Sequence, residues 1–245
     1  MNNQSKANGR ELSLAGGLLA CAMLLPATAS AAEIELEISN LTQGIYFTPL
    51  LVVGHGDNYH LFETGAAASA GLQAMAEGGA LTDLVTEAEG LGAEVLANPA
   101  EGLLAPAKQV AVASFDSKMN GYLSIAGMIL PSNDGFVGLD SWPIPDQAGS
   151  YTLYLNAYDA GTEANDELMT GGGAPGVAGI PANPGANGGT SGTGVTSTEL
   201  TQMVHVHRGN VGDTDASGGA SDLDSRIHRW INPVAKVVVT VKGDE

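Results

Sequence analysis

The sequence predicts an all-β fold, an antiparallel β-sandwich with one or two short helices and long loops rich in glycine and aspartate. Residues 33–38 alternate charged and apolar side chains with a period of two, which is typical of a half-buried strand. Further segments are rich in β-branched or aromatic residues. These segments are 109–115, 122–130, 150–158, 202–207 and 234–241. No regular alternation of strand and helix accompanies them, so the pattern favours an antiparallel sandwich over a parallel sheet.

The N-terminal half combines strands with two short helical segments. Residues 40–44 are predicted to form a turn, 45–53 a second and more buried strand, and 54–58 a loop. Residues 66–76 have the small-residue face of a helix, and 81–88 indicate a second helix with Thr82 as its N-cap. Both segments are rich in alanine and glycine, so we expect them to lie against a sheet.

The C-terminal half contains two long loops and the predicted closing strand. Residues 171–194 consist of small and polar residues without charge or aromatic rings, which predicts a flexible Gly/Pro-rich loop within the domain. Residues 209–225 form a second loop, which is acidic. The last strand places Val237, Val239 and Val241 on one face, with polar residues on the other.

The N-terminus has the pattern of an export signal. Lys6 and Arg10 precede an apolar stretch of about 14 residues, and Ala29-Ser30-Ala31 supplies the small residues of a cleavage site. The stretch is shorter than the roughly 20 residues of a membrane-spanning helix. We predict a signal peptide of residues 1–31, cleavage after Ala31, and a secreted or periplasmic domain of residues 32–245 without a transmembrane segment. A membrane anchor, or a lipoprotein processed at Cys21, is the alternative interpretation.

Charge and cysteine content restrict the possible partners. The chain has 27 acidic and 9 basic residues, a net charge of −18, and loss of the signal would leave 26 and 7, about −19. Such a surface repels nucleic acids and attracts divalent cations, although solubility or a saline habitat would select the same composition. The only cysteine, Cys21, lies in the predicted signal. The processed domain is therefore expected to have no disulfide and to depend on core burial.

Short segments in order carry a resemblance to a known family. Residues 128–138, with the sequence MILPSNDGFVG, are similar to a strand and a loop that typically contains Ser-Pro-Asp-Trp. Residues 159–163, DAGTE, are similar to an Asp-Ala-Gly-Thr-Asp signature. Residues 47–55 and 68–76 before them, and 230–237 after them, are similar to further family segments. Over residues 33–242 the chain thus resembles the spondin N-terminal domain family, in its bacterial single-domain form.

The resemblance implies a C2-like β-sandwich that binds one Ca²⁺ ion through Asp134, Asp159 and Glu163. The chain departs from the family in having Glu163 where animal members have aspartate, Asn133 and Gly135 where they have proline and tryptophan, and no disulfides. Residue chemistry is compatible with the site, because Asp134 follows one strand and Asp159 ends another, and calcium prefers oxygen ligands. The alternative is that both aspartates only cap turns.

Two other groups of residues suggest metal sites. His205 and His207 share one face of a predicted strand, and His55, His60 or His228 could complete a zinc site, although no His-Glu-x-x-His motif accompanies them. Asp213, Asp215, Asp222 and Asp224 flank two glycines and could form a second calcium loop. They lack the full Asp-x-Asp-x-Asp-Gly-x5-Glu pattern, so a solvated acidic loop is the favoured interpretation.

The sequence contains no recognised catalytic motif. Neither a Gly-x-Ser-x-Gly elbow nor a phosphate-binding Gly-x-x-x-x-Gly-Lys loop is present. Two tryptophans and two tyrosines could form a ligand platform or pack in the sheet: Trp142, Trp230, Tyr151 and Tyr154. We expect a non-enzymatic, secreted, calcium-binding adhesion or recognition module with an extracellular protein or glycan partner. The alternatives are a secreted zinc-dependent or unrecognised hydrolase using His205 and His207, and a metal-free structural protein of the envelope or matrix.

Overall fold

The computed structural model describes residue 1 and residues 33–118 and 120–243. Apart from Met1, the predicted signal peptide and its cleavage site after Ala31 lie outside the described residues. Within the described part, no helix is long and apolar enough to cross a membrane.

Within residues 33–243, apart from residue 119, ten strands form one antiparallel sheet, which confirms the predicted all-β class. The strands are β1 (Glu33–Asn40), β2 (Tyr46–Phe47), β3 (Leu51–His55), β4 (Glu94–Ala97), β5 (Gln109–Asp116), β6 (Tyr122–Leu130), β7 (Gly135–Pro143), β8 (Gly149–Asp159), β9 (His205–Val206) and β10 (Ala235–Val241). Their order is β4-β3-β6-β7-β8-β10-β1-β5, with β2 paired to β6 and β9 to β8.

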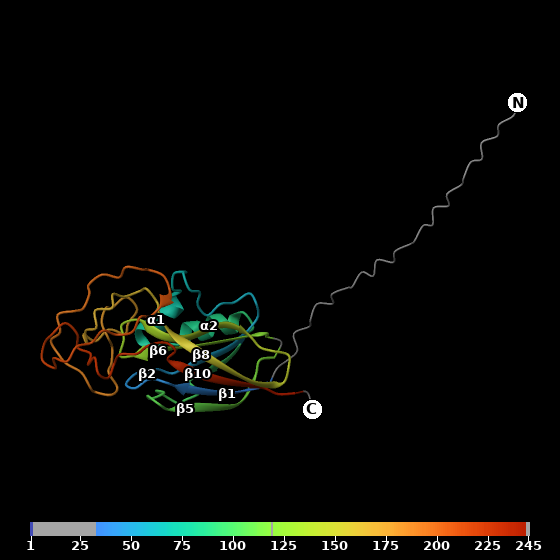
Figure 1. The fold of residues 1–245 in the computed structure, drawn as a ribbon, viewed down its shortest axis with the longest axis horizontal. Helices are drawn as coiled ribbons and strands as arrows, with labels where there is room; N and C mark the ends of the chain where they lie inside the picture. The colour runs from blue at the N-terminus through green and yellow to red at the C-terminus, as the bar shows by residue number, and fades with distance from the viewer. Residues whose placement is uncertain (2–32, 119, 244–245) are drawn as a thin grey trace.

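The sheet folds over itself into two layers that share β8 (Figure 1). Residues 156–159 of β8 pair with β7, and residues 149–155 pair with β10. The two edge strands approach one another where Lys118, just after β5, forms an ion pair with Glu94 of β4. The sheet is therefore nearly closed, and the long loops of the C-terminal half gather at one end of it (Figure 1).

The core explains the two kinds of strand pattern in the sequence. On β1, Ile34, Leu36 and Ile38 are buried between the layers, and the glutamates between them face outward. On β6, Leu123 and Ile125 enter the same core, whereas Ala126 and Met128 face a second core beneath the helices. A strand covered on both faces needs apolar residues at every position, which explains the unbroken apolar run of β6.

Two helices, α1 (Ala70–Gly78) and α2 (Thr82–Gly90), cover the outer face of the layer that contains β6. At the start of α1, Ser69 Oγ accepts a hydrogen bond from the Leu72 N–H, and Gly79 ends the helix with φ of 72°. The prediction that Thr82 caps the second helix is wrong. Leu81 occupies the cap position without a side-chain hydrogen bond, and Thr82 is the first residue of the helix.

Several element boundaries differ from the predictions. The segment 45–53 is divided into β2 and β3, with Pro49, which has no N–H to donate, in the gap. Residues 54 and 55, predicted as loop, belong to β3, and the predicted strand 202–207 is reduced to His205–Val206. The sequence pattern does not predict β4, and residues 135–138, interpreted as part of a loop, form the start of β7. Residues 171–194 contain no helix or strand, and their flexibility stays a prediction.

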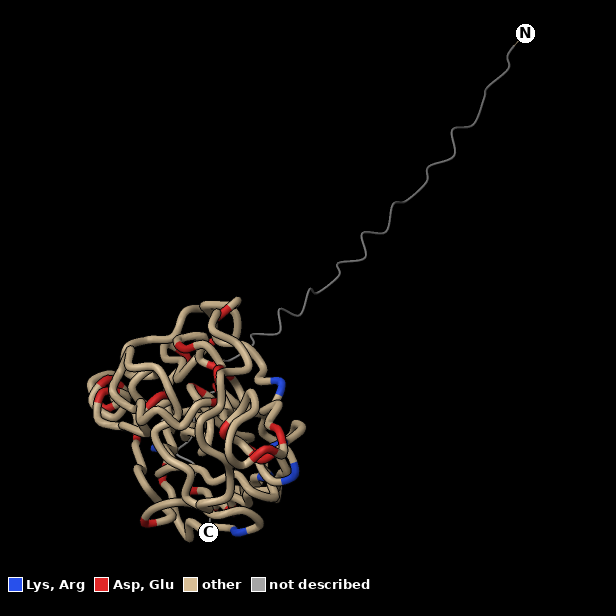
Figure 2. Tube along the Cα trace, turned by 90° about the vertical axis from the view of Figure 1, so that its left-hand side faces the viewer, with Lys and Arg blue, Asp and Glu red and all other residues tan. Residues whose placement is uncertain are grey.

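Acidic residues are distributed over the whole body, with few basic residues between them (Figure 2). The acidic side chains are not confined to the predicted calcium loops. Charge alone therefore does not locate a cation site, because the acidic residues are spread over the body.

Candidate functional site

The predicted ligands Asp134 and Asp159 lie together at the end of the sheet that carries the long loops. Asp134 is in the connection between β6 and β7, and Asp159 is the last residue of β8. Gly135 and Asp159 are register partners, and the Ala160 N–H donates to the Asp134 carbonyl oxygen at 3.2 Å. Strand pairing thus places the two aspartates next to one another. We call this pair the acidic site.

Asp134 is fully buried, and its two carboxylate oxygens have different surroundings. Oδ2 accepts hydrogen bonds from the Thr162 N–H at 2.7 Å, the Thr162 hydroxyl at 3.2 Å and the Glu163 N–H at 3.1 Å. Oδ1 has no hydrogen-bond partner among the described residues. Burial, followed by the negative charge of Asp159, raises the pKa of Asp134 to about 7.

Asp159 is also buried, and neighbouring groups hold both of its carboxylate oxygens. Oδ1 accepts from the Gly161 N–H at 2.8 Å, and Oδ2 accepts from Asn165 Nδ2 at 2.7 Å. Burial raises the pKa of Asp159, and these two hydrogen bonds oppose the shift. The turn after β8 donates its Gly161 N–H to the carboxylate. This contact accompanies a tight turn at Gly161, where φ is 70°, a conformation that favours glycine.

The third predicted ligand, Glu163, directs its carboxylate to a different set of groups. Oε2 accepts from the Gly179 N–H at 3.1 Å and from Asn133 Nδ2 at 3.4 Å, and Oε1 is buried without a partner among the described residues. Burial raises the pKa of Glu163 to about 7, and the charges of Glu77 and Asp166 add to the shift. Across the described residues, no three His, Cys, Asp or Glu side chains form a group that could hold a metal ion.

The two histidines of the predicted zinc site lie beside Asp159. Their Nε2 atoms are 3.7 Å (His205) and 4.0 Å (His207) from Asp159 Oδ2. His207 Nδ1 accepts the Gly209 N–H at 3.0 Å, so its Nε2 carries the proton and donates to Asn165 Oδ1 at 3.1 Å. Burial lowers the pKa of His207 to about 3. The neutral His207 ring therefore supports Asn165, which in turn holds Asp159.

The other three histidines lie in separate surroundings. His55 contacts Ser124 Oγ through Nε2 at 2.7 Å, His60 contacts Asp140, and His228 Nδ1 accepts the Asp224 N–H. None of them joins His205 and His207. His207 has Asn165 and Gly209 as its hydrogen-bond partners. Asn165 lies 42 residues before His207, and Gly209 contributes only its backbone N–H, so no spacing motif could have identified either partner.

The acidic loop, residues 209–225, uses its carboxylates to bind backbone N–H groups. Asp213 Oδ2 accepts from Ala220 and Ser221 at 2.9 Å each. Asp222 accepts from Met169 at 2.8 Å and Gly192 at 2.9 Å, which ties the acidic loop to the Gly/Pro-rich loop. These contacts organise the loop and are compatible with the favoured interpretation of an acidic loop, and a second ion site stays an untested alternative.

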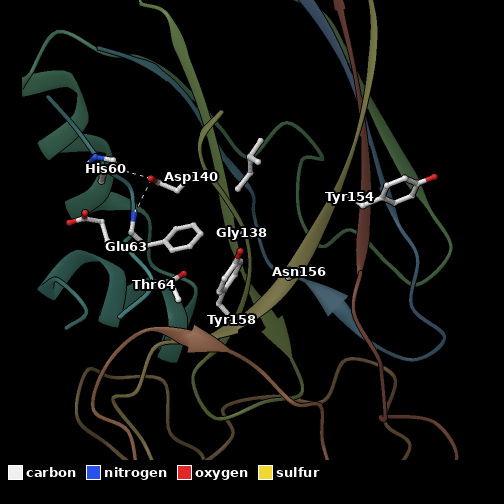
Figure 3. Close-up of a pocket in the computed structure, with 10 residues that line it drawn as sticks. His60, Glu63, Thr64, Gly138, Asp140, Tyr154, Asn156 and Tyr158 are labelled. Atoms are coloured by element: carbon white, nitrogen blue, oxygen red, sulfur yellow. Dashed lines mark hydrogen bonds and ion pairs between the residues drawn. The ribbon is translucent and has the colours of Figure 1, made fainter. Parts of the chain in front are cut away.

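A cavity of about 400 Å³ lies between the segment after β3 and the strands β7 and β8 (Figure 3). On one wall, His60 Nδ1 is 2.7 Å from Asp140 Oδ2, and the hydrogen bond raises the pKa of His60. Asp140 Oδ1 accepts from the Leu61 N–H at 2.7 Å. The polar groups of this wall thus bind one another and attach residues 60–62 to β7.

The four aromatic residues considered for a ligand platform do not share one surface. Trp142 and Tyr151 pack on each other with 6.0 Å between ring centroids, and Trp230 packs on His207. Tyr154 is 64% exposed and points away from the other labelled residues in Figure 3. The structure therefore supports the packing interpretation for Trp142 and Trp230.

Comparison with known proteins gives one informative match. A family model described as Spondin_N matches residues 39–170, more than half of the chain, and this region contains Asp134, Asp159 and Glu163. A search of curated proteins finds no match.

Proposed function

Because the chain belongs to the spondin N-terminal domain family, we propose that it is a secreted calcium-binding module used in adhesion or recognition. The family is one of extracellular domains, so the assignment supports an extracellular recognition module. Calcium binding, adhesion and an extracellular protein or glycan partner are the proposed part. The proposal includes export with cleavage after Ala31 and no enzymatic activity.

The observation that carries the calcium proposal is the state of the Asp134 carboxylate. Oδ1 is buried without a hydrogen-bond partner among the described residues, next to a second buried carboxylate, that of Asp159. Two buried carboxylates without a cation are costly, since each loses its hydration and the charges repel. A divalent cation would offset both costs.

The donor chemistry of these residues fits such an ion, although three of the described carboxylates do not converge on one point. Calcium takes six to eight oxygen ligands, and both aspartates can supply carboxylate oxygens. Bound calcium would supply the positive charge that balances the two carboxylates. Glu163 is the third proposed ligand, and its buried Oε1 also lacks a partner among the described residues. The Thr162 and Glu163 N–H groups hold Asp134 Oδ2, which fixes the carboxylate with Oδ1 free for a ligand.

The experiment compares metal content and thermal unfolding of the processed protein, residues 32–245, with EDTA, Ca²⁺, Mg²⁺ or Zn²⁺. We expect one bound Ca²⁺ and a rise in Tm that Asp134→Asn abolishes. Asp146→Asn, an exposed change of the same charge, serves as the matched control. Stoichiometric zinc would support the hydrolase alternative with His205 and His207, and no response to any metal would support the metal-free structural role.

A further inference from the structure

A cavity of about 640 Å³ lies at the same end of the sheet, outside the acidic site. Residues 41–43, which follow β1, form one side, and residues 229–233, which precede β10, form the other. We call it the Arg229 cavity. Its position among the connecting loops is typical of recognition surfaces, since a rigid sheet can position loops for binding.

The walls of the Arg229 cavity contain large apolar side chains that face solvent. Ile231 is 88% exposed and Leu41 is 47% exposed. Pro233 and the largely buried Trp230 also line the cavity. Exposed apolar side chains that gather around a concavity mark interaction sites more often than single exposed ones do. Aromatic and arginine side chains are also enriched in the binding centres of protein interfaces.

Arg229 adds a positive charge to the wall of the cavity. Its side chain is exposed and makes no hydrogen bond or ion pair with any residue that the structure describes. In contrast, Arg226 forms an ion pair with Asp224 at 2.6 Å. A guanidinium left without a carboxylate in a chain of net charge −18 is available to a carboxylate from outside.

Hydrogen bonds of the Asn232 side chain and of the backbone hold the cavity in shape before any partner binds. Asn232 Oδ1 accepts the Ala157 N–H at 2.7 Å, and Asn232 Nδ2 donates to the His207 carbonyl at 3.3 Å. On the other side, the Leu41 N–H donates to the Val234 carbonyl at 2.9 Å. These bonds attach both walls to the sheet. A preformed surface loses less conformational entropy on binding, which favours affinity.

We propose that the Arg229 cavity binds a segment of a protein partner in which an Asp or Glu carboxylate stands next to an aliphatic or aromatic side chain. The carboxylate pairs with Arg229, and the apolar side chain packs against Ile231 and Leu41. The proposal rests on the recognition role in the proposed function and does not depend on calcium. A second copy of this chain would bring a further net charge of −18, and an anionic membrane carries many negative charges, so both are repelled more strongly than a segment with a single carboxylate.

The test uses an acetylated and amidated Gly-Asp-Leu-Phe peptide and its Asn and Lys counterparts, titrated into ¹⁵N-labelled protein at low and high salt. We expect the Asp peptide to shift the Trp230 indole and the amides of residues 229–232, with binding that salt weakens. Affinity should fall at least tenfold for the Asn peptide, and also for Arg229→Ala. Ile231→Ser should weaken binding, and Lys118→Ala, the same charge change at the other end of β1, should not.

Other outcomes overturn the proposal. These are equal binding of the Asp and Asn peptides, no effect of Arg229→Ala, or no shift by any peptide at millimolar concentration. Binding of the same residues to cellotetraose or to phosphatidylcholine–phosphatidylglycerol vesicles in place of the peptide would also overturn it, as would dimerisation that Arg229→Ala abolishes. All titrations are run in Ca²⁺ and in EDTA, so that failure of this proposal is distinguished from failure of calcium binding.

Discussion

The Trp230 indole packs on the His207 ring, with 4.9 Å between ring centroids and 47° between the ring planes. His207 Nε2 is 4.0 Å from Asp159 Oδ2. One buried ring thus contacts both the acidic site and a residue that lines the Arg229 cavity. Any change at Asp159 that moves the imidazole changes the surroundings of the indole.

Trp230 should therefore report calcium binding. The chain has two tryptophans, so Trp142→Phe leaves Trp230 as the only indole fluorophore. We expect the emission of this variant to change on addition of Ca²⁺ and to return on addition of EDTA, because the ion would pull on Asp159 and relax its contacts with Asn165 and His207. In the Asp134→Asn background the same addition should leave the emission unchanged. A calcium response that persists there would place the ion elsewhere.

In the absence of metal, Asp134→Asn should stabilise the protein. The asparagine Oδ1 can accept the Thr162 and Glu163 N–H groups, and the neutral amide avoids a buried charge beside Asp159. We expect a gain of roughly 1–3 kcal/mol in the free energy of unfolding in EDTA at pH 8, measured by urea unfolding, because burial raises the pKa of Asp134. With Ca²⁺ the order should reverse, since only the wild type binds the ion. Equal stability under both conditions contradicts the assignment of Asp134.

Much of the fold could be predicted from the sequence because strand periodicity is a local property. The run at β6 and the alternation at β1 identify strands without knowledge of their partners. Strand β7 could not be identified in this way, since two glycines, an aspartate and a proline interrupt its pattern. Its pairing with β6 and β8 supplies what its own sequence lacks.

The candidate site could be predicted only in part, for a similar reason. Asp134 and Asp159 meet because β7 and β8 are paired. Their positions at strand ends in the sequence indicated that they could meet at one end of the sheet. Glu163 differs, because its longer side chain reaches the Gly179 N–H in a loop 16 residues away. The Arg229 cavity had no sequence signal at all, since residues 41–43 and 229–233 become neighbours only when β1 and β10 pair.

Stability without calcium should depend on pH through Asp134. Its folded-state pKa of about 7 lies above the ordinary value of 3.8, so the native state binds more protons between these values. The contribution is fully present below pH 3.8 and is lost as the pH rises toward 7. His207 has the opposite effect, because its pKa is lowered from 6.5 to about 3 in the folded state. As the pH falls below 6.5, the unfolded state binds a proton that the folded state does not, and the protein loses stability. The difference in Tm between Asp134→Asn and wild type in EDTA isolates Asp134, and it should grow from pH 5 to pH 8.

Glu167 should hold the acidic loop in place. Its buried carboxylate accepts the Val211 N–H at 2.5 Å, the Gly212 N–H at 2.8 Å and the Ser221 hydroxyl at 2.6 Å. Glu167→Gln weakens these three hydrogen bonds, because it places an amide NH₂ group next to hydrogen-bond donors. We therefore expect the free energy of unfolding in urea to fall by about 1–3 kcal/mol. Amide hydrogen exchange of residues 211–221 should accelerate. Glu101→Gln, the same substitution at an exposed residue, should alter neither measurement. An equal effect of the two variants would show that the carboxylate of Glu167 does not hold the loop.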